Sequence, residues 1–124
     1  MDEKNPQFCA GGDTLIFACS GAADVGQISD RAARKLTQDG KGKMFCLAGI
    51  GGHVQPILDK TKAASRVLAI DGCSLDCTRK TLEHAGIHEV THVRVTDLGM
   101  EKGKTPATEP NVETVARAGI SLLD

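Results

Sequence analysis

Short apolar runs alternate with amphipathic segments along this 124-residue chain, and no other feature constrains its fold as strongly. The runs have the length and aliphatic composition of buried strands, and they lie at 15–18, 43–48 and 66–70. Each is followed by a glycine-containing turn and then by a segment with helical periodicity, at 25–38, from Pro56 onward and at 74–85. Strands that alternate with helices in this way form a parallel sheet covered by helices on both faces.

The C-terminal third of the chain supplies a fourth strand and a last helix. Residues 88–96 partly alternate in polarity, as an edge strand does, and 111–123 carry an apolar helical face. The polar loop between them, 97–110, is longer than most connections, and long loops are often lids. We therefore expect a single three-layer α/β domain over 13–124, Rossmann-like or flavodoxin-like, with a mostly parallel four-stranded sheet. Residues 1–12 read as a flexible lead-in.

Composition argues against two classes of partner. A net charge of −1 and only three aromatic residues, all Phe, provide neither a basic face nor a stacking surface for nucleic acid. No apolar stretch approaches the roughly 20 residues that cross a bilayer, so we expect no membrane partner. The first residues lack the apolar core of a secretion signal, and we expect a cytoplasmic protein.

Four of the five cysteines follow the predicted strands closely. Three of them stand where an apolar run ends, and the fourth comes four residues later: Cys19, Cys46, Cys73 and Cys77. Right-handed crossovers place all β→α turns at one edge of a parallel sheet, which is where such sheets bind ligands. Thiols stay reduced in the cytoplasm, and four thiolates suit a tetrahedral zinc ion. We expect these four cysteines to be the ligands of a metal ion, with Zn²⁺ as the first choice.

Other interpretations of the cysteines stay open. Their spacings of 27, 27 and 4 residues differ from the paired CxxC of a zinc ribbon. A buried cysteine can also behave as a small apolar residue, and Cys46 beside Phe45 fits that description. Cys9, in the polar lead-in, is expected to be a free surface thiol. Cys73 and Cys77 are expected to share one face of the 74–85 helix, with Leu75 pointing inward.

Polar side chains near these turns are candidates for supporting roles. His53 lies in the predicted second loop at 49–53. It is a candidate metal ligand, a candidate hydrogen-bond donor to a ligand, or a candidate proton shuttle. Asp71 is expected to accept a hydrogen bond from a ligand loop, and Asp76 to favour the start of the following helix. The charges at 101–104 are expected to form a solvated loop.

Three segments carry a family resemblance. They are 17–26 (FACSGAADVG), 46–52 (CLAGIGG) and 70–77 (IDGCSLDC), and they resemble the DGC-domain proteins, to which zinc binding is ascribed. The resemblance spans about 14–123 and implies that the metal ligands of this chain are Cys19, Cys46, Cys73 and Cys77. It also implies a small bacterial or archaeal protein, but it names no activity. Relatives often carry Pro where this chain has Ser74, and Ser can cap a helix, so the resemblance still implies the same site.

Three functional hypotheses follow from these residues. The first is a zinc-binding protein for metal storage, delivery or sensing. The second is a thiol-dependent enzyme or sulfur carrier that uses Cys73 and Cys77, although CxxxC differs from the redox CxxC motif. The third is an iron–sulfur protein, since four cysteines also hold a cluster. The sequence specifies neither a small-molecule substrate nor a protein partner, and the apolar face at 112–123 leaves a homodimer open.

Overall fold

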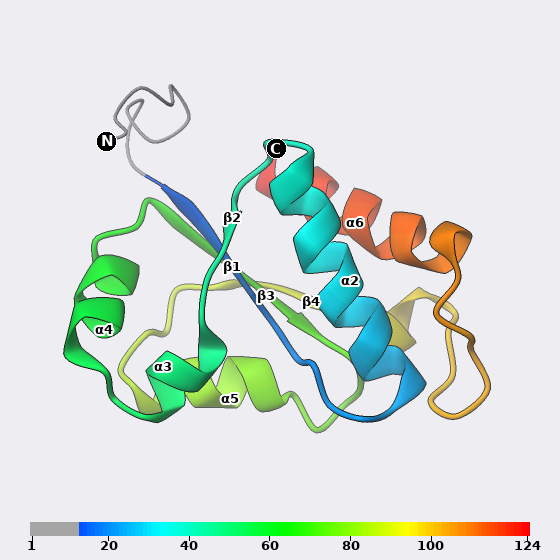
Figure 1. The fold of residues 1–124 in the computed structure, drawn as a ribbon, viewed down its shortest axis with the longest axis horizontal. Helices are drawn as coiled ribbons and strands as arrows, with labels where there is room; N and C mark the ends of the chain where they lie inside the picture. The colour runs from blue at the N-terminus through cyan, green and yellow to red at the C-terminus, as the bar shows by residue number, and fades with distance from the viewer. Residues whose placement is uncertain (1–12) are drawn as a thin grey trace.

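A computed structural model describes residues 13–124 as one four-stranded parallel sheet between two layers of helices (Figure 1). The strands are β1 (Thr14–Ala18), β2 (Lys43–Met44), β3 (Arg66–Asp71) and β4 (Thr91–Arg94). The helices are α2 (Asp24–Gln38), α3 (Leu47–Gly51), α4 (Gln55–Lys62), α5 (Cys77–His84), the 3₁₀ helix η2 (Val95–Leu98) and α6 (Glu109–Leu123). The lead-in predicted at 1–12 and its Cys9 lie outside the described residues.

The sheet has the order β2-β1-β3-β4, and all neighbouring strands are parallel. The chain moves outward in one direction from β1 to β2 and in the other from β3 to β4. The order therefore reverses between the two central strands, which creates a switch point at their carboxyl ends. This arrangement confirms the expected doubly wound α/β class. Among the described helices, none is long and apolar enough to span a membrane.

The two faces of the sheet bury separate apolar clusters. Ile16, Leu68 and Ile70 are fully buried against α2 and α6. Leu15, Phe17 and Ala69 alternate with them and are fully buried on the opposite face, under α3, α4 and α5. Because both faces are covered, the strands have the continuous apolar character of a parallel sheet.

The second predicted strand, at 43–48, is wrong in its second half. Only Lys43–Met44 pairs with β1, and Leu47–Gly51 forms a short helix that was expected to be strand and loop. A side chain at Gly49 would place its Cβ against the side chain of Ile57, so glycine allows α3 to pack closely on α4. An apolar run as short as this one does not distinguish a buried strand from a helix by periodicity.

The helix predicted at 74–85 begins later, at Cys77. Residues 72–76 form the turn, and Asp76 adopts a left-handed conformation with φ 53°. Cys73 therefore lies outside the helix and does not share a helical face with Cys77, contrary to expectation. Leu75 is 59% exposed instead of pointing inward, because it belongs to the turn. Thr78 and Leu82, on the inner face of this helix, are buried.

The last strand and helix agree with their predictions. Strand β4 lies at the edge of the sheet, within the predicted 88–96, and α6 begins two residues before the predicted 111. The apolar face of α6 packs onto the sheet and α2. The long polar loop is shorter than predicted, because η2 occupies its first residues.

Candidate thiol and metal site

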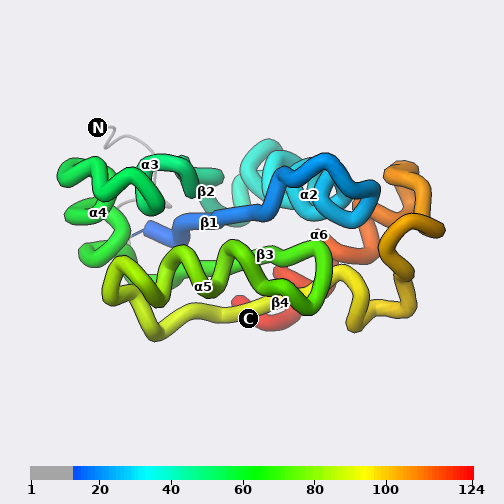
Figure 2. The backbone as a smooth tube through the Cα atoms, turned by 90° about the horizontal axis from the view of Figure 1, so that it is seen from below, coloured from blue at the N-terminus to red at the C-terminus, as the bar shows by residue number. Residues whose placement is uncertain are grey.

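Cys19 and Cys73 follow the two central strands, on either side of the switch point. The N–H of Cys19 donates to the carbonyl of Ile70 at 2.9 Å, which continues the β1–β3 pairing to the edge of the sheet. The hydroxyl of Ser29 donates to the carbonyl of Cys19 and ties this turn to α2. Both thiols are half-buried and free. Figure 2 views the molecule from the side where the β1–α2 turn and α5 lie.

The turn after β3 packs tightly on the first turn of α2. A Cβ at Gly72 would come within 3.0 Å of the backbone of Val25, so only glycine fits there without displacement. The turns that carry Cys19 and Cys73 are thus held by the same helix. The two turns lie at the carboxyl edge of the sheet, as predicted from the sequence.

Cys46 lies at the transition from β2 to α3. Its sulfur accepts a hydrogen bond from the N–H of Gly49 at 3.3 Å and so caps the short helix. The thiol is exposed, which excludes the interpretation of Cys46 as a buried apolar residue. It stands at the carboxyl end of β2, next to β1 in the sheet.

Cys77 is the first residue of α5, and its thiol is exposed. It lines a pocket of about 440 Å³ together with residues of α3 and α5 and the turns beside them. His53 lines the same pocket, so the structure brings this candidate histidine to the side of the molecule that carries Cys77.

The four sulfur atoms do not form a close group in this structure. Across residues 13–124, only one set of three or more His, Cys, Asp or Glu side chains has ligand atoms within 4.8 Å of one another, and it consists of Asp71, Asp76 and His92. The cysteines lie on neighbouring turns at wider spacing. Their assignment as metal ligands stays a prediction.

Asp71 supports the turn from within. Its side chain is 1% exposed, and one oxygen accepts the N–H of Thr78 at 2.7 Å. The other accepts the N–H of Arg79 at 3.1 Å and contacts Nε2 of His92 at 2.9 Å. Asp71 therefore caps α5 directly after Cys77, as expected for a hydrogen-bond acceptor beside a ligand loop.

Asp76 stands at the start of α5, as expected, but its side chain makes no capping hydrogen bond. The guanidinium of Arg94 donates two hydrogen bonds to its carboxylate, at 2.9 and 2.7 Å, and Arg79 donates a third at 3.1 Å. The bond from Arg94 is the main cause that lowers the pKa of Asp76 to about 2, and it raises the pKa of Arg94. Because N–H donors already occupy these oxygens, we interpret Asp71, Asp76 and His92 as a support for the turn, not as a metal site.

A loop from the far end of the chain reaches this edge. Residues 99–108, which we call the clasp loop, connect η2 to α6. The carboxylate of Asp24, at the start of α2, accepts the N–H of Gly103 at 2.9 Å and the N–H of Thr105 at 3.0 Å. These backbone hydrogen bonds, that of Gly103 first, lower the pKa of Asp24.

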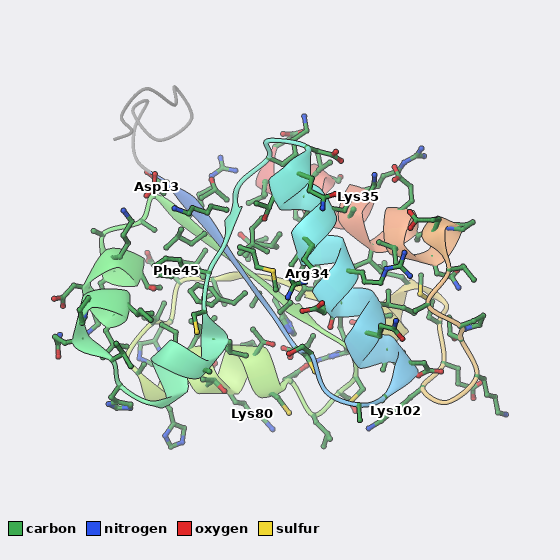
Figure 3. All side chains as sticks on the ribbon, viewed as in Figure 1. Asp13, Arg34, Lys35, Phe45, Lys80 and Lys102 are labelled. Atoms are coloured by element: carbon green, nitrogen blue, oxygen red, sulfur yellow. The ribbon has the colours of Figure 1, made fainter. Side chains whose placement is uncertain are left out.

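The clasp loop brings a cation to one of the thiols. Nζ of Lys102 lies 3.7 Å from Sγ of Cys73. Figure 3 shows Lys102 at the same lower edge of the molecule as Lys80 of α5. The charges of residues 101–104 are exposed, as expected, but the contact between Lys102 and Cys73 was not predicted.

Fold and site together define a doubly wound α/β domain with free thiols at the carboxyl edge of its sheet. A sequence model described as DGC domain matches residues 15–118, so the chain belongs to the DGC-domain family. The chain is similar to the anaerobic and virulence modulator AnvM of Pseudomonas aeruginosa (strain PAO1), with 31% identity over 88 residues. That alignment covers 71% of this chain and 67% of the relative. No solved structure matches the chain.

Proposed function

We propose that this domain binds one thiophilic metal ion, with zinc as the first candidate, through Cys19, Cys46, Cys73 and Cys77. One observation carries the proposal: three neighbouring β→α turns of a parallel sheet each bear a free cysteine, and a fourth begins the adjacent helix. Thiolate sulfur is the ligand that zinc and iron–sulfur clusters take in proteins.

Four cysteine thiolates are ligands that suit zinc. The thiols are too widely spaced here to bind one ion together, so the turns that carry them would have to move closer. Sulfur ligands in a tetrahedral zinc site lie about 2.3 Å from the ion. Here no three of the four cysteine sulfurs lie within 4.8 Å of one another. Cys46 and Cys77 are exposed and stand at the starts of helices, so they can approach the half-buried pair Cys19 and Cys73. A bound zinc ion would supply an electrostatic cross-link between the turns, and four thiolates would leave it no open position.

Of storage, delivery and sensing, we favour sensing. The name of the P. aeruginosa relative describes an anaerobic and virulence modulator, which is a regulatory description. Thiolates are oxidised in steps that remove their ability to bind a metal, and the first step is reversible. A metal site made only of thiolates would therefore respond to oxidants.

Anaerobic purification of the full chain followed by metal analysis and thiol titration tests the proposal. We expect one zinc per chain and four protected thiols, with metal lost on substitution of each ligand by Ser. Cys9→Ser is the matched control and should keep its metal. A coloured protein with iron and inorganic sulfide would select the cluster alternative. Equal metal content in all five variants would reject the assignment.

A second candidate function, chemistry at a thiol, is favoured by one observation. The ammonium of Lys102 lies 3.7 Å from the sulfur of Cys73, and cationic neighbours are typical of reactive cysteines. A metal-free protein with one fast-reacting thiol at Cys73 would support this alternative, whereas four slow, protected thiols would exclude it.

A further inference from the structure

Hydrogen bonds hold the clasp loop on both sides of Lys102. Asp24 accepts the N–H of Gly103, the residue after Lys102, and the N–H of Thr105. The hydroxyl of Thr105 also bonds the backbone of Glu101, the residue before Lys102, accepting its N–H at 2.7 Å and donating to its carbonyl at 2.9 Å. The backbone around Lys102 is thus fixed by contacts to α2 and within the loop.

Fixing the backbone changes what the lysine can do. A surface lysine loses side-chain entropy when it is held in one place, so most exposed ion pairs contribute little. If the backbone is already fixed in position, the lysine side chain loses less conformational entropy when it contacts the sulfur. The contact between Nζ of Lys102 and Sγ of Cys73 joins residues 29 positions apart, and the bond from Gly103 to Asp24 spans 79.

We propose that Asp24 and the clasp loop form a latch that holds the Lys102 ammonium against the Cys73 sulfur. The latch supplies positive charge to a site whose thiolates are negative. Cys73 should then react preferentially with anionic reagents, and a negatively charged metal–thiolate centre should be stabilised. The second consequence rests on the proposed function, whereas the first does not.

Lys104 provides a matched control within the same loop. It has the same charge, its side chain is 74% exposed, and it lies 3.9 Å from Glu101. Lys104→Met therefore removes an equal charge two residues away from Lys102. Any effect that depends on net charge alone should be the same in Lys102→Met and Lys104→Met.

The latch can be tested in the metal-free full chain with two alkylating reagents. In both reactions the thiolate sulfur attacks the methylene carbon and iodide leaves, but iodoacetate is anionic and iodoacetamide is neutral. The ratio of their rates at Cys73, followed by peptide mapping, reports the local charge, because the fraction of thiolate cancels. We expect Lys102→Met to lower this ratio about fivefold.

Several controls give this experiment its meaning. Asp24→Asn should lower the ratio at Cys73 to a similar extent, because the loop no longer positions the lysine. Lys104→Met should leave it unchanged, and the ratio at Cys77 should stay constant in all variants. An unchanged ratio at Cys73 in Lys102→Met would overturn the latch, as would equal effects of Lys102→Met and Lys104→Met.

Zinc affinity, measured by competition with a chromogenic chelator, tests the second consequence. Lys102→Met and Asp24→Asn should each weaken zinc binding by about threefold to tenfold. The double variant should be no weaker than either single one, because residues that act as a unit are not additive. Additive losses would contradict a latch. If wild type binds no zinc, the proposed function fails, and the alkylation ratio still decides the latch.

Discussion

Asp71 accepts hydrogen bonds from two backbone N–H groups of α5 and contacts His92, although its side chain is 1% exposed. These hydrogen bonds fix the start of α5, whose first residue is Cys77. The geometry of the turn before Cys77 therefore depends on this buried carboxylate and on Asp76.

We predict that Asp71→Asn destabilises the fold by roughly 2 kcal/mol. The amide would turn an N–H group toward a backbone N–H donor and leave it unsatisfied in a buried place. Urea unfolding measures this loss. Asp59→Asn is the control, since Asp59 is exposed and bonds only the side chain of Gln55, and it should change stability by less than about 0.5 kcal/mol. Similar losses for both substitutions would refute the capping role.

The pair of Asp76 and Arg94 should make stability depend on pH. The pKa of Asp76 falls from 3.8 to about 2 in the folded protein, mainly because of Arg94. A lowered pKa in the folded state means that the stabilisation is complete above about pH 4 and is lost as the pH falls toward 2.

We therefore predict that Arg94→Met destabilises the protein at pH 6, and that the difference from wild type shrinks between pH 4 and pH 2. Denaturant unfolding at both ends of this range measures it. Arg34→Met, which removes the surface pair with Asp30, should show a much smaller difference from wild type than Arg94→Met at pH 6, and one that changes little with pH. A gap between Arg94→Met and wild type that stays constant down to pH 2 would contradict the assignment.

Sequence patterns predicted the cysteine positions but not the contacts of Lys102, Arg94 and Asp24. The cysteines follow apolar runs, and strand ends are legible from local periodicity. The latch joins residues 29 and 79 positions apart, and no local pattern encodes such a contact. A long polar loop was the only signal that pointed to it.

The elements around the site show why their starts are hard to predict. In α5, the first N–H groups are capped by Asp71 from before the turn, so the helix begins at Cys77 and not at Ser74. In α3, a cysteine sulfur serves as the cap, which is not among the preferred capping groups. The first shift comes from a contact between residues seven positions apart, and the second from an unusual cap only three residues away.

Packing between a turn and a helix gives a prediction at this scale. A Cβ at Gly26 of α2 would lie 2.6 Å from the carbonyl oxygen of Gly21, and backbone there cannot move aside easily. We expect Gly26→Ala to destabilise the fold by about 1–3 kcal/mol, measured by thermal or urea unfolding.

Gly51→Ala, at the end of α3, is the helical control for this prediction. Its Cβ would meet Cγ2 of Thr81 at 3.7 Å, which is an ordinary contact, so we expect little change or a small gain. Equal stability of Gly26→Ala and Gly51→Ala would show that the turn after β1 tolerates displacement.

The domain is held by two apolar clusters, one on each face of the sheet. Among the described residues, no cysteine belongs to the buried part of either cluster. The three-layer arrangement was predictable, because alternating strands and helices permit few topologies, whereas the order of the strands in the sheet was not predicted. How closely the turns approach one another was not predictable, since it depends on contacts such as that between Gly72 and Val25.

It follows that removal of a bound metal should loosen the turns and leave the sheet. We expect a chelator to leave most of the far-UV circular dichroism signal unchanged, while hydrogen exchange accelerates in the turns after β1, β2 and β3. The chelator added to a Cys46→Ser variant is the control, because a protein that has lost its metal should not respond. Complete unfolding by the chelator would show that the ion holds the core together.

The central claim, that four cysteines share one metal ion, is tested most directly by X-ray absorption spectroscopy on the anaerobically purified protein. The account predicts a zinc edge with four sulfur neighbours at about 2.3 Å. A shell dominated by oxygen or nitrogen, or a protein that retains no metal while its thiols are reduced, would contradict it.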